Sequence, residues 1–250
     1  MIDTHAHLYN EYYEDLDKTI ADIKASGVKK VIVNGCDMKS NLEVLELVKK
    51  YDIVYGAIGF HPTELNDDIN DSLIFLENHI NDEKIVAIGE IGLDYHYDDT
   101  NKEKQINAFK KQLKIAEKYK KPVIVHSRDA IQDTYDILFN YNVVGSIHSF
   151  SGSLEMAREF IKNGFYIGIG GVCTFNNAKN IVQVIENINL SYILLETDSP
   201  YLTPVPYRGQ TNTPAYIPII AKKISEIKKV SLDEVVKATT DNATGLFDFW

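Results

Sequence analysis

Residues 2–8 have the sequence Ile2-Asp3-Thr4-His5-Ala6-His7-Leu8, which places two histidines two positions apart. In a β-strand, side chains at i and i+2 point to the same face, so His5 and His7 can contact one cation. A buried parallel strand that ends in a polar residue delivers that side chain to a rim shared with the other strands. Four more residues of ligand type follow apolar runs: Glu90, His126, His148 and Asp198. The sequence therefore predicts a metal site where several strands end.

Strand-like apolar runs alternate with helix-like segments along the whole chain. Eight units of this kind in 250 residues match the usual size of a (β/α)₈ TIM-type barrel, which we predict as a single domain over residues 1–250. A doubly wound open sheet is the alternative, but ligands from at least five strands favour the closed barrel. The runs are Ile2, Val31–Val33, Ile53–Ile58, Ile85–Ile88, Val123–Val125, Val143–Ile147, Phe165–Ile169 and Ile193–Leu195.

Helical periodicity appears between these runs. Apolar residues recur every three or four positions over 106–116 and again over 217–227. Ser231-Leu232-Asp233-Glu234 resembles a capping box that opens a shorter terminal helix. Because the first strand begins at the second residue, there is little room for an N-terminal segment that covers the barrel.

The amino-acid composition limits the binding partners and the cellular location that can be expected. The net charge of −10, from 26 basic and 36 acidic residues, argues against broad electrostatic binding to nucleic acid or to acidic membranes. It does not exclude a polyanionic substrate, because bound cations can be the largest charges in a site. Only two cysteines, no signal-like segment and no apolar stretch of about 20 residues predict a cytoplasmic protein that does not enter a membrane. We expect a monomer.

The six ligand-type residues predict a site for two metal ions. Four histidines and two carboxylates exceed the three or four protein ligands of a typical single catalytic site. Two divalent ions that share Glu90 would account for all six, and Asp198 could also orient a water molecule. The mixed nitrogen and oxygen donors suit Zn²⁺, Mn²⁺, Co²⁺ or Fe²⁺, whereas Mg²⁺ usually prefers oxygen. Lys84 is the lysine nearest to Glu90 in the sequence, but it lies at the opposite end of the same strand. It is therefore a worse candidate than Glu90 for bridging the two ions.

Three further residues are candidates for substrate binding. His61 follows the third strand, Arg128 lies two residues after His126, and Arg208 lies in the loop after the last strand. The planar guanidinium group suits a phosphate. Each arginine could equally pair within its loop, and His61 could instead support the metals. His96 follows no apolar run and is a weaker candidate, and His79 is expected on the surface.

At these residues the chain resembles the TatD family of metal-dependent deoxyribonucleases, within the amidohydrolase-type barrels. The resemblance runs nearly end to end through DTHAHL, GFHP, GEIGLDYHYD, KPVIVHSRDA, IHSFSGS, NGFYIGIGG, LLETDSPYLTP and PVPYRG, in family order. It implies divalent metals such as Mg²⁺ at the six ligand positions. It also implies hydrolysis of DNA phosphodiesters by 3′-to-5′ exonuclease action on single strands.

Two departures from the family pattern bear on the substrate. The family often continues PVPYRG with Lys-Arg-Asn, where this chain has Gln210-Thr211-Asn212, and Thr63 stands where a histidine is common. Two positive charges beside the expected substrate path are thus missing. The alternatives are a hydrolase of a small ester, lactone or amide, an aminoacyl-tRNA deacylase, and a metal-dependent binding protein without catalysis.

Overall fold

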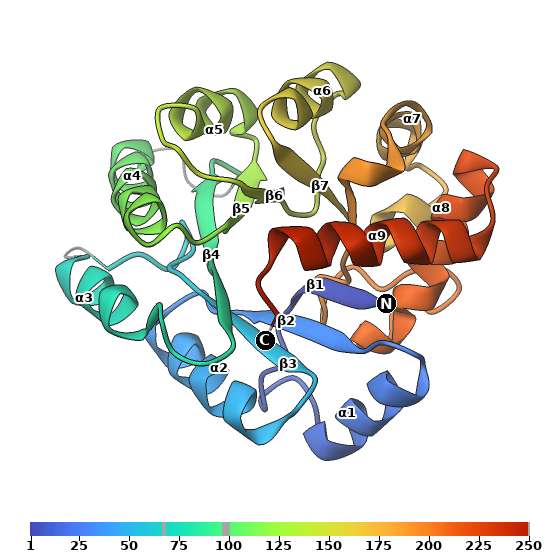
Figure 1. Ribbon diagram of the computed structural model, residues 1–250, viewed down its shortest axis with the longest axis horizontal. Coiled ribbons are helices and arrows are strands. Elements are labelled where there is room, and N and C mark those ends of the chain that lie inside the picture. The colour runs from blue at the N-terminus through green and yellow to red at the C-terminus, as the bar shows by residue number, and fades with distance from the viewer. Residues whose placement is uncertain (67–68, 97–100, 250) are drawn as a thin grey trace.

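The part of the chain that the structure describes folds into a ring of eight parallel strands surrounded by helices (Figure 1). The computed structural model describes residues 1–66, 69–96 and 101–249; Tyr97 and Asp98 of the GEIGLDYHYD motif lie outside these ranges. The strands pair in chain order: β1 (Ile2–Ala6), β2 (Lys30–Asn34), β3 (Val54–Ile58), β4 (Ile85–Asp94), β5 (Val123–Arg128), β6 (Gly145–Ile147), β7 (Phe165–Ile169) and β8 (Ile193–Leu195).

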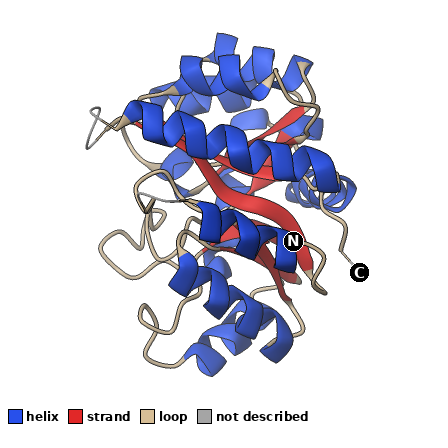
Figure 2. Ribbon diagram, turned by 90° about the vertical axis from the view of Figure 1, so that its left-hand side faces the viewer, coloured by secondary structure: helices blue, strands red, loops and turns tan. Residues whose placement is uncertain are grey.

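Each strand is followed by helical structure that packs on the outside of the ring. The α-helices are α1 (Leu16–Ala25), α2 (Met38–Lys50), α3 (Asn70–His79), α4 (Lys102–Tyr119), α5 (Ile131–Leu138), α6 (Leu154–Lys162), α7 (Lys179–Asn187), α8 (Ile217–Lys228) and α9 (Leu232–Leu246). Short 3₁₀ helices are η1 (Gly171–Thr174), η2 (Leu190–Tyr192) and η3 (Pro214–Tyr216). The predicted barrel is therefore confirmed. In Figure 2 the longer loops project from the side opposite both chain ends.

The ring is closed by the chain that follows β8 rather than by β8 itself. The backbone N–H of Asp198 donates to His5 O at 2.9 Å, and the N–H of His7 donates to Ser199 O at 2.7 Å. Ala6 and Ser199 form an isolated parallel bridge at the same place. Closure thus depends on the backbone of three predicted metal ligands, His5, His7 and Asp198, and on that of Ser199.

The barrel has two apolar regions. A large cluster fills the space between strands and helices, whereas a smaller one fills the barrel interior at the end where the strands begin. Phe247, fully buried just after α9, packs in the smaller cluster with Ile2 and Leu194. Helix α9 crosses this end of the barrel in Figure 1. Helix α9 and the residue that follows it therefore cover this end of the barrel.

Three expectations about elements were wrong. Helix α9 has 15 residues and is longer than α8, which has 12. Its N-cap is correct, because the Ser231 side chain accepts a hydrogen bond from Glu234 N. Strands β4 and β5 continue past Glu90 and His126 to Asp94 and Arg128, so these ligand candidates lie within their strands.

Candidate metal centre

Irregular pairing in β1 and β4 places their polar side chains inside the barrel. In β1, three residue steps from Asp3 to Ala6 oppose two steps in β2, and β4 shows the same excess between Ile88 and Ile91. Such a bulge changes which residues face inward. Beyond the bulge, Ile91 packs in the outer core, so Glu90 and its alternating neighbours face the interior.

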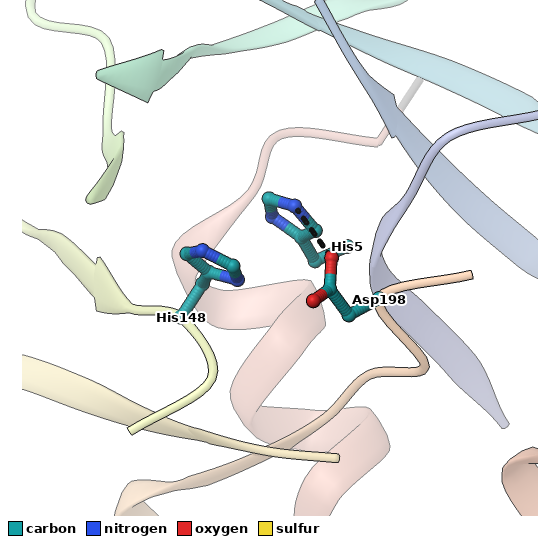
Figure 3. A group of neighbouring side chains, drawn as sticks. All are labelled: His5, His148 and Asp198. Atoms are coloured by element: carbon teal, nitrogen blue, oxygen red, sulfur yellow. Dashed lines mark ion pairs between the residues drawn. The ribbon is translucent and has the colours of Figure 1, made fainter. Parts of the chain in front are cut away.

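One half of the centre consists of His5, His7 and Asp198. Nε2 of His5 lies 3.2 Å from Nε2 of His7, and Oδ1 of Asp198 lies 3.6 Å from each of these atoms. Glu90 Oε2 completes the group, at 3.3 Å from His5 Nε2 and 3.7 Å from His7 Nε2. Figure 3 shows that Asp198 and His148 both project toward the ring of His5.

The other half lies around the second oxygen of Glu90. Its Oε1 is 2.7 Å from His126 Nδ1, 2.8 Å from His148 Nε2 and 3.5 Å from His61 Nε2. The hydroxyl of Thr63, the residue that departs from the family pattern, lies 2.8 Å from the opposite nitrogen of His61. The ring of His61 also packs edge-on against His126, with centroids 4.3 Å apart.

The donor atoms fit divalent cations. Atoms that share a cation at about 2.0–2.2 Å lie about 3–4 Å apart, as most of these do. Among the described residues, three overlapping groups of candidate ligands have donor atoms within 4.8 Å of one another, and all these atoms are imidazole nitrogens or carboxylate oxygens. The protein therefore has buried His, Glu and Asp clusters suited to binding metal ions. The three groups are His5 with His148 and Asp198, His5 with His7 and Glu90, and His61 with Glu90 and His126.

Asp94 supports the centre, although it is not among the site residues predicted from the sequence. Its Oδ2 lies 3.1 Å from His126 Nε2, which leaves His126 Nδ1 directed at Glu90. A carboxylate in this position fixes the orientation and tautomer of a metal-binding histidine. Gln105 holds the Asp94 backbone through two hydrogen bonds, at 2.8 and 2.7 Å. The signal was available, since Glu90, Gly92 and Asp94 alternate along one strand.

Glu196 is a second buried acid that the sequence prediction did not include. It lies behind His148, with Oε1 3.9 Å from His148 Nδ1, and it accepts a hydrogen bond from the backbone N–H of Ser149. A Cβ atom on Gly168 would lie 2.3 Å from its carboxylate, so only glycine leaves room there. Burial raises the pKa of Glu196 to about 8.

The protonation states of the ligands are strongly coupled. Burial opposes the charge of His148, but the carboxylate of Glu90 overcomes it and raises the pKa of His148 to about 9. Burial also opposes the charge of Glu90, yet the surrounding histidines, His148 first, hold its pKa well below the usual range. Burial and the neighbouring His148 lower the pKa of His5 to about 4. Without metal, protons therefore neutralise part of the carboxylate charge.

A cavity of about 810 Å³ opens above the centre. Half-buried Arg128 lines it, as do His61 and Thr63, whereas exposed Arg208 is not among the described residues that line it. Arg208 instead donates to Thr203 O at 3.0 Å, and its guanidinium lies 4.1 Å from the centre of the Phe175 ring. His96 is exposed and lies 2.8 Å from Asp129.

The structure also shows the positions of Lys84 and His79, two residues that were not expected in the metal centre. Lys84 points away from the centre and donates to the carbonyl oxygens of Val48 and Tyr51 at 3.0 and 2.9 Å. His79 lies on α3 and pairs with Asp82 at 2.7 Å, at the protein surface. Within the described residues, no helix is long and apolar enough to cross a membrane.

Comparisons with known proteins agree with this architecture. The family described as TatD related DNase matches residues 2–248. The metal-dependent hydrolase YabD of Bacillus subtilis is 41% identical, with 99% of this chain and 98% of YabD aligned. YcfH of Escherichia coli, also described as a metal-dependent hydrolase, is 36% identical over 99% of this chain and 95% of its own.

The comparison of structures gives the same result. The crystal structure of the TatD homologue YjjV from Escherichia coli superposes with a TM-score of 0.93 at 32% identity, and covers 100% of this chain and 98% of YjjV. An organophosphorus hydrolase from Deinococcus radiodurans shares the fold with a TM-score of 0.68 at 12% identity, over 98% of this chain and 92% of its own.

Proposed function

This chain belongs to the TatD-related DNase family of metal-dependent hydrolases, and from that premise we propose that it hydrolyses the phosphodiester bonds of single-stranded DNA, from the 3′ end. The observation that carries the proposal is the placement of Glu90 between two sets of histidines. One carboxylate oxygen faces His5 and His7, and the other faces His126 and His148. A bridging carboxylate of this kind suits two ions that act on one phosphate.

Each side chain has a distinct part in this proposal. His5, His7 and Asp198 would hold one ion, His126 and His148 the other, with Glu90 shared. When bound, Mg²⁺, Mn²⁺ or Zn²⁺ ions would supply an activated water and would neutralise phosphate charge. Asp198 has a second oxygen, Oδ2, that can accept a proton from the attacking water.

Substrate contacts come from the residues around the ligands. Half-buried Arg128 lines the cavity next to the histidines, where its guanidinium can bind a phosphate through two nitrogens. His61 lies 3.5 Å from Glu90, close enough either to ligate an ion or to contact the substrate. Arg208, outside the cavity lining, would bind a more distant phosphate of the strand.

The first experiment uses 5′-labelled single-stranded DNA and metal-stripped protein that is reconstituted with Mg²⁺, Mn²⁺ or Zn²⁺. We expect metal-dependent products that shorten from the 3′ end. The control is Asp198→Asn, because Asp198 has a φ of +54° and asparagine adopts this left-handed conformation as readily as aspartate. The variant should fold normally and should lose all cleavage. Cleavage at the wild-type rate would show that a contaminating nuclease is responsible.

One observation favours a second candidate function. Glu11, Asp37, Glu43 and Glu64 line the cavity on the side of β1 to β3, and they would repel a DNA strand that crossed there. A small ester or lactone would not meet this repulsion. If folded, metal-loaded protein cleaves no DNA but hydrolyses p-nitrophenyl acetate or a lactone, the second candidate replaces the first.

A further inference from the structure

A second cavity of about 300 Å³ lies beside the metal cavity, and the function of DNA cleavage proposed above gives it a role. The two cavities share Ser149 and Ser151, which follow β6. We propose that this second cavity, which we call the Phe175 pocket, binds a nucleobase of the DNA strand whose phosphate lies at the metal centre. The inference deepens the proposed function and rests on it.

The lining of the Phe175 pocket suits a flat heteroaromatic ring. Apolar side chains form much of the wall: Phe150, Val172, Phe175 and Ile181. Nucleobases have apolar faces that pack on aromatic and aliphatic side chains, and edges that form hydrogen bonds. A volume of about 300 Å³ is small for a drug-sized ligand, so it suits one base rather than a longer segment of DNA.

Two asparagines supply polar groups for the edges of a base. The Asn180 amide nitrogen donates to Ser151 O at 3.1 Å and to Gly152 O at 2.8 Å. These bonds fix the amide across the loop that the two cavities share. Asn177 also lines the pocket and is exposed to solvent. Asn180 uses both of its amide hydrogens in these bonds, so its Oδ1 remains to accept a hydrogen bond from a base. The amide of Asn177 can both donate and accept, and it can therefore pair with any of the four bases.

The charges around the two cavities direct a polyanion toward the Phe175 pocket. On the opposite side, Lys39 is paired with Glu11 at 2.6 Å, so its charge does not offset Asp37, Glu43 and Glu64. On the pocket side, Arg208 covers one face of the Phe175 ring. The strand therefore meets repulsion in one direction and an arginine in the other, and its next base reaches the pocket.

The test compares binding of normal and base-free DNA. The probes are a fluorescent five-nucleotide single strand and the same strand with tetrahydrofuran residues in place of its nucleosides. Fluorescence anisotropy gives Kd in the Asp198→Asn background, so that cleavage does not interfere. Ala178→Phe would fill the pocket, since Ala178 is half-buried in its wall. Asn177→Ala removes one amide, and Asn176→Ala is the matched control at an exposed residue outside both linings.

We expect the normal strand to bind about tenfold more tightly than the base-free strand, as for one stacked base. Ala178→Phe should abolish this preference, Asn177→Ala should weaken it, and Asn176→Ala should leave it unchanged. Equal affinity for the two strands, or equal weakening of both by Ala178→Phe, would overturn the inference. The proposed function is tested separately, by cleavage of bis(p-nitrophenyl) phosphate and of DNA with the metal-loaded wild type. Absence of cleavage would contradict the proposed function, whereas the difference in Kd between the two strands would still test the base pocket.

Discussion

Replacement of Glu90 by glutamine tests whether one buried charge organises the metal centre. Glutamine keeps the size of the side chain but removes the negative charge that raises the pKa of His148. In the metal-free protein, His148 would then lose its proton near neutral pH. The variant should therefore be less stable than the wild type only in the pH range in which His148 of the wild type is protonated.

The magnitude follows from the pKa of His148. A histidine with a pKa of about 9 in the folded state and about 6.5 in the unfolded state contributes about 2–3 kcal/mol to stability at pH 7. Because the folded pKa is the higher one, this contribution is complete below about pH 6.5 and is lost as the pH rises through about 9. Glu90→Gln should lower the free energy of unfolding by about 2–3 kcal/mol at pH 7 and by far less at pH 10.

The assay is urea unfolding in EDTA at pH 7 and pH 10, followed by circular dichroism. Glu64→Gln is the matched control, because Glu64 is an exposed acid of the same cavity, and it should change stability by less than about 0.5 kcal/mol. Addition of Mn²⁺ should raise the Tm of the wild type and not that of Glu90→Gln. An equal loss of stability at both pH values would refute the reasoning, since it would mean that packing and not charge is affected.

Other parts of the structure lead to further expectations. Asp94→Asn should weaken metal binding about 10–100-fold in a Mn²⁺ titration while the far-UV spectrum stays unchanged; unchanged affinity would contradict the role of Asp94 in orienting His126. Binding of metal should displace the proton of His148, so the apparent affinity for Mn²⁺ should rise about tenfold from pH 7 to pH 8, and calorimetry in two buffers should detect proton release. Phe247→Ala should lower stability by about 3–5 kcal/mol in urea without a change in metal affinity, because Phe247 packs at the opposite end of the barrel. Arg128→Gln should raise KM for DNA about tenfold or more through loss of a charged phosphate contact, and an unchanged KM would place the phosphate elsewhere.

Apolar runs predicted the strands from β2 to β8, because parallel strands of a barrel are covered on both faces. Strand β1 carries Asp3, Thr4 and His5, and it was predicted from Ile2 and the spacing of the two histidines. Strand ends were predicted less well. Glu90 and His126 appeared to end β4 and β5, since polar residues usually mark the end of a buried strand. In the structure, Ile91 and Leu93 still face the helices while Glu90 and Asp94 face the interior. A strand that lines a polar site alternates in this way, and Asp94 was missed for that reason.

Local sequence patterns could not predict features that depend on contacts between distant parts of the chain. The length of α9 depends on the open end of the barrel that it covers, not only on its own capping residue. Arg208 was expected near the phosphates because it follows the last strand, but its position depends on contacts with Thr203 and Phe175. Glu196 contacts Ser149, in the loop after β6, and lies against Gly168 of β7, so its surroundings come from other parts of the chain.

The seam that closes the barrel has a consequence for the order of events during synthesis. Asp198 and Ser199, whose backbones pair with those of His5 and His7, leave the ribosome about 190 residues later than the two histidines. At about 5–20 residues per second, this interval lasts about 10–40 seconds. Until then one edge of β1 has no partner and the first ligand set is incomplete. The metal centre can therefore be assembled only after Asp198 has been synthesised, when all the described strands of the barrel are already present in the nascent chain.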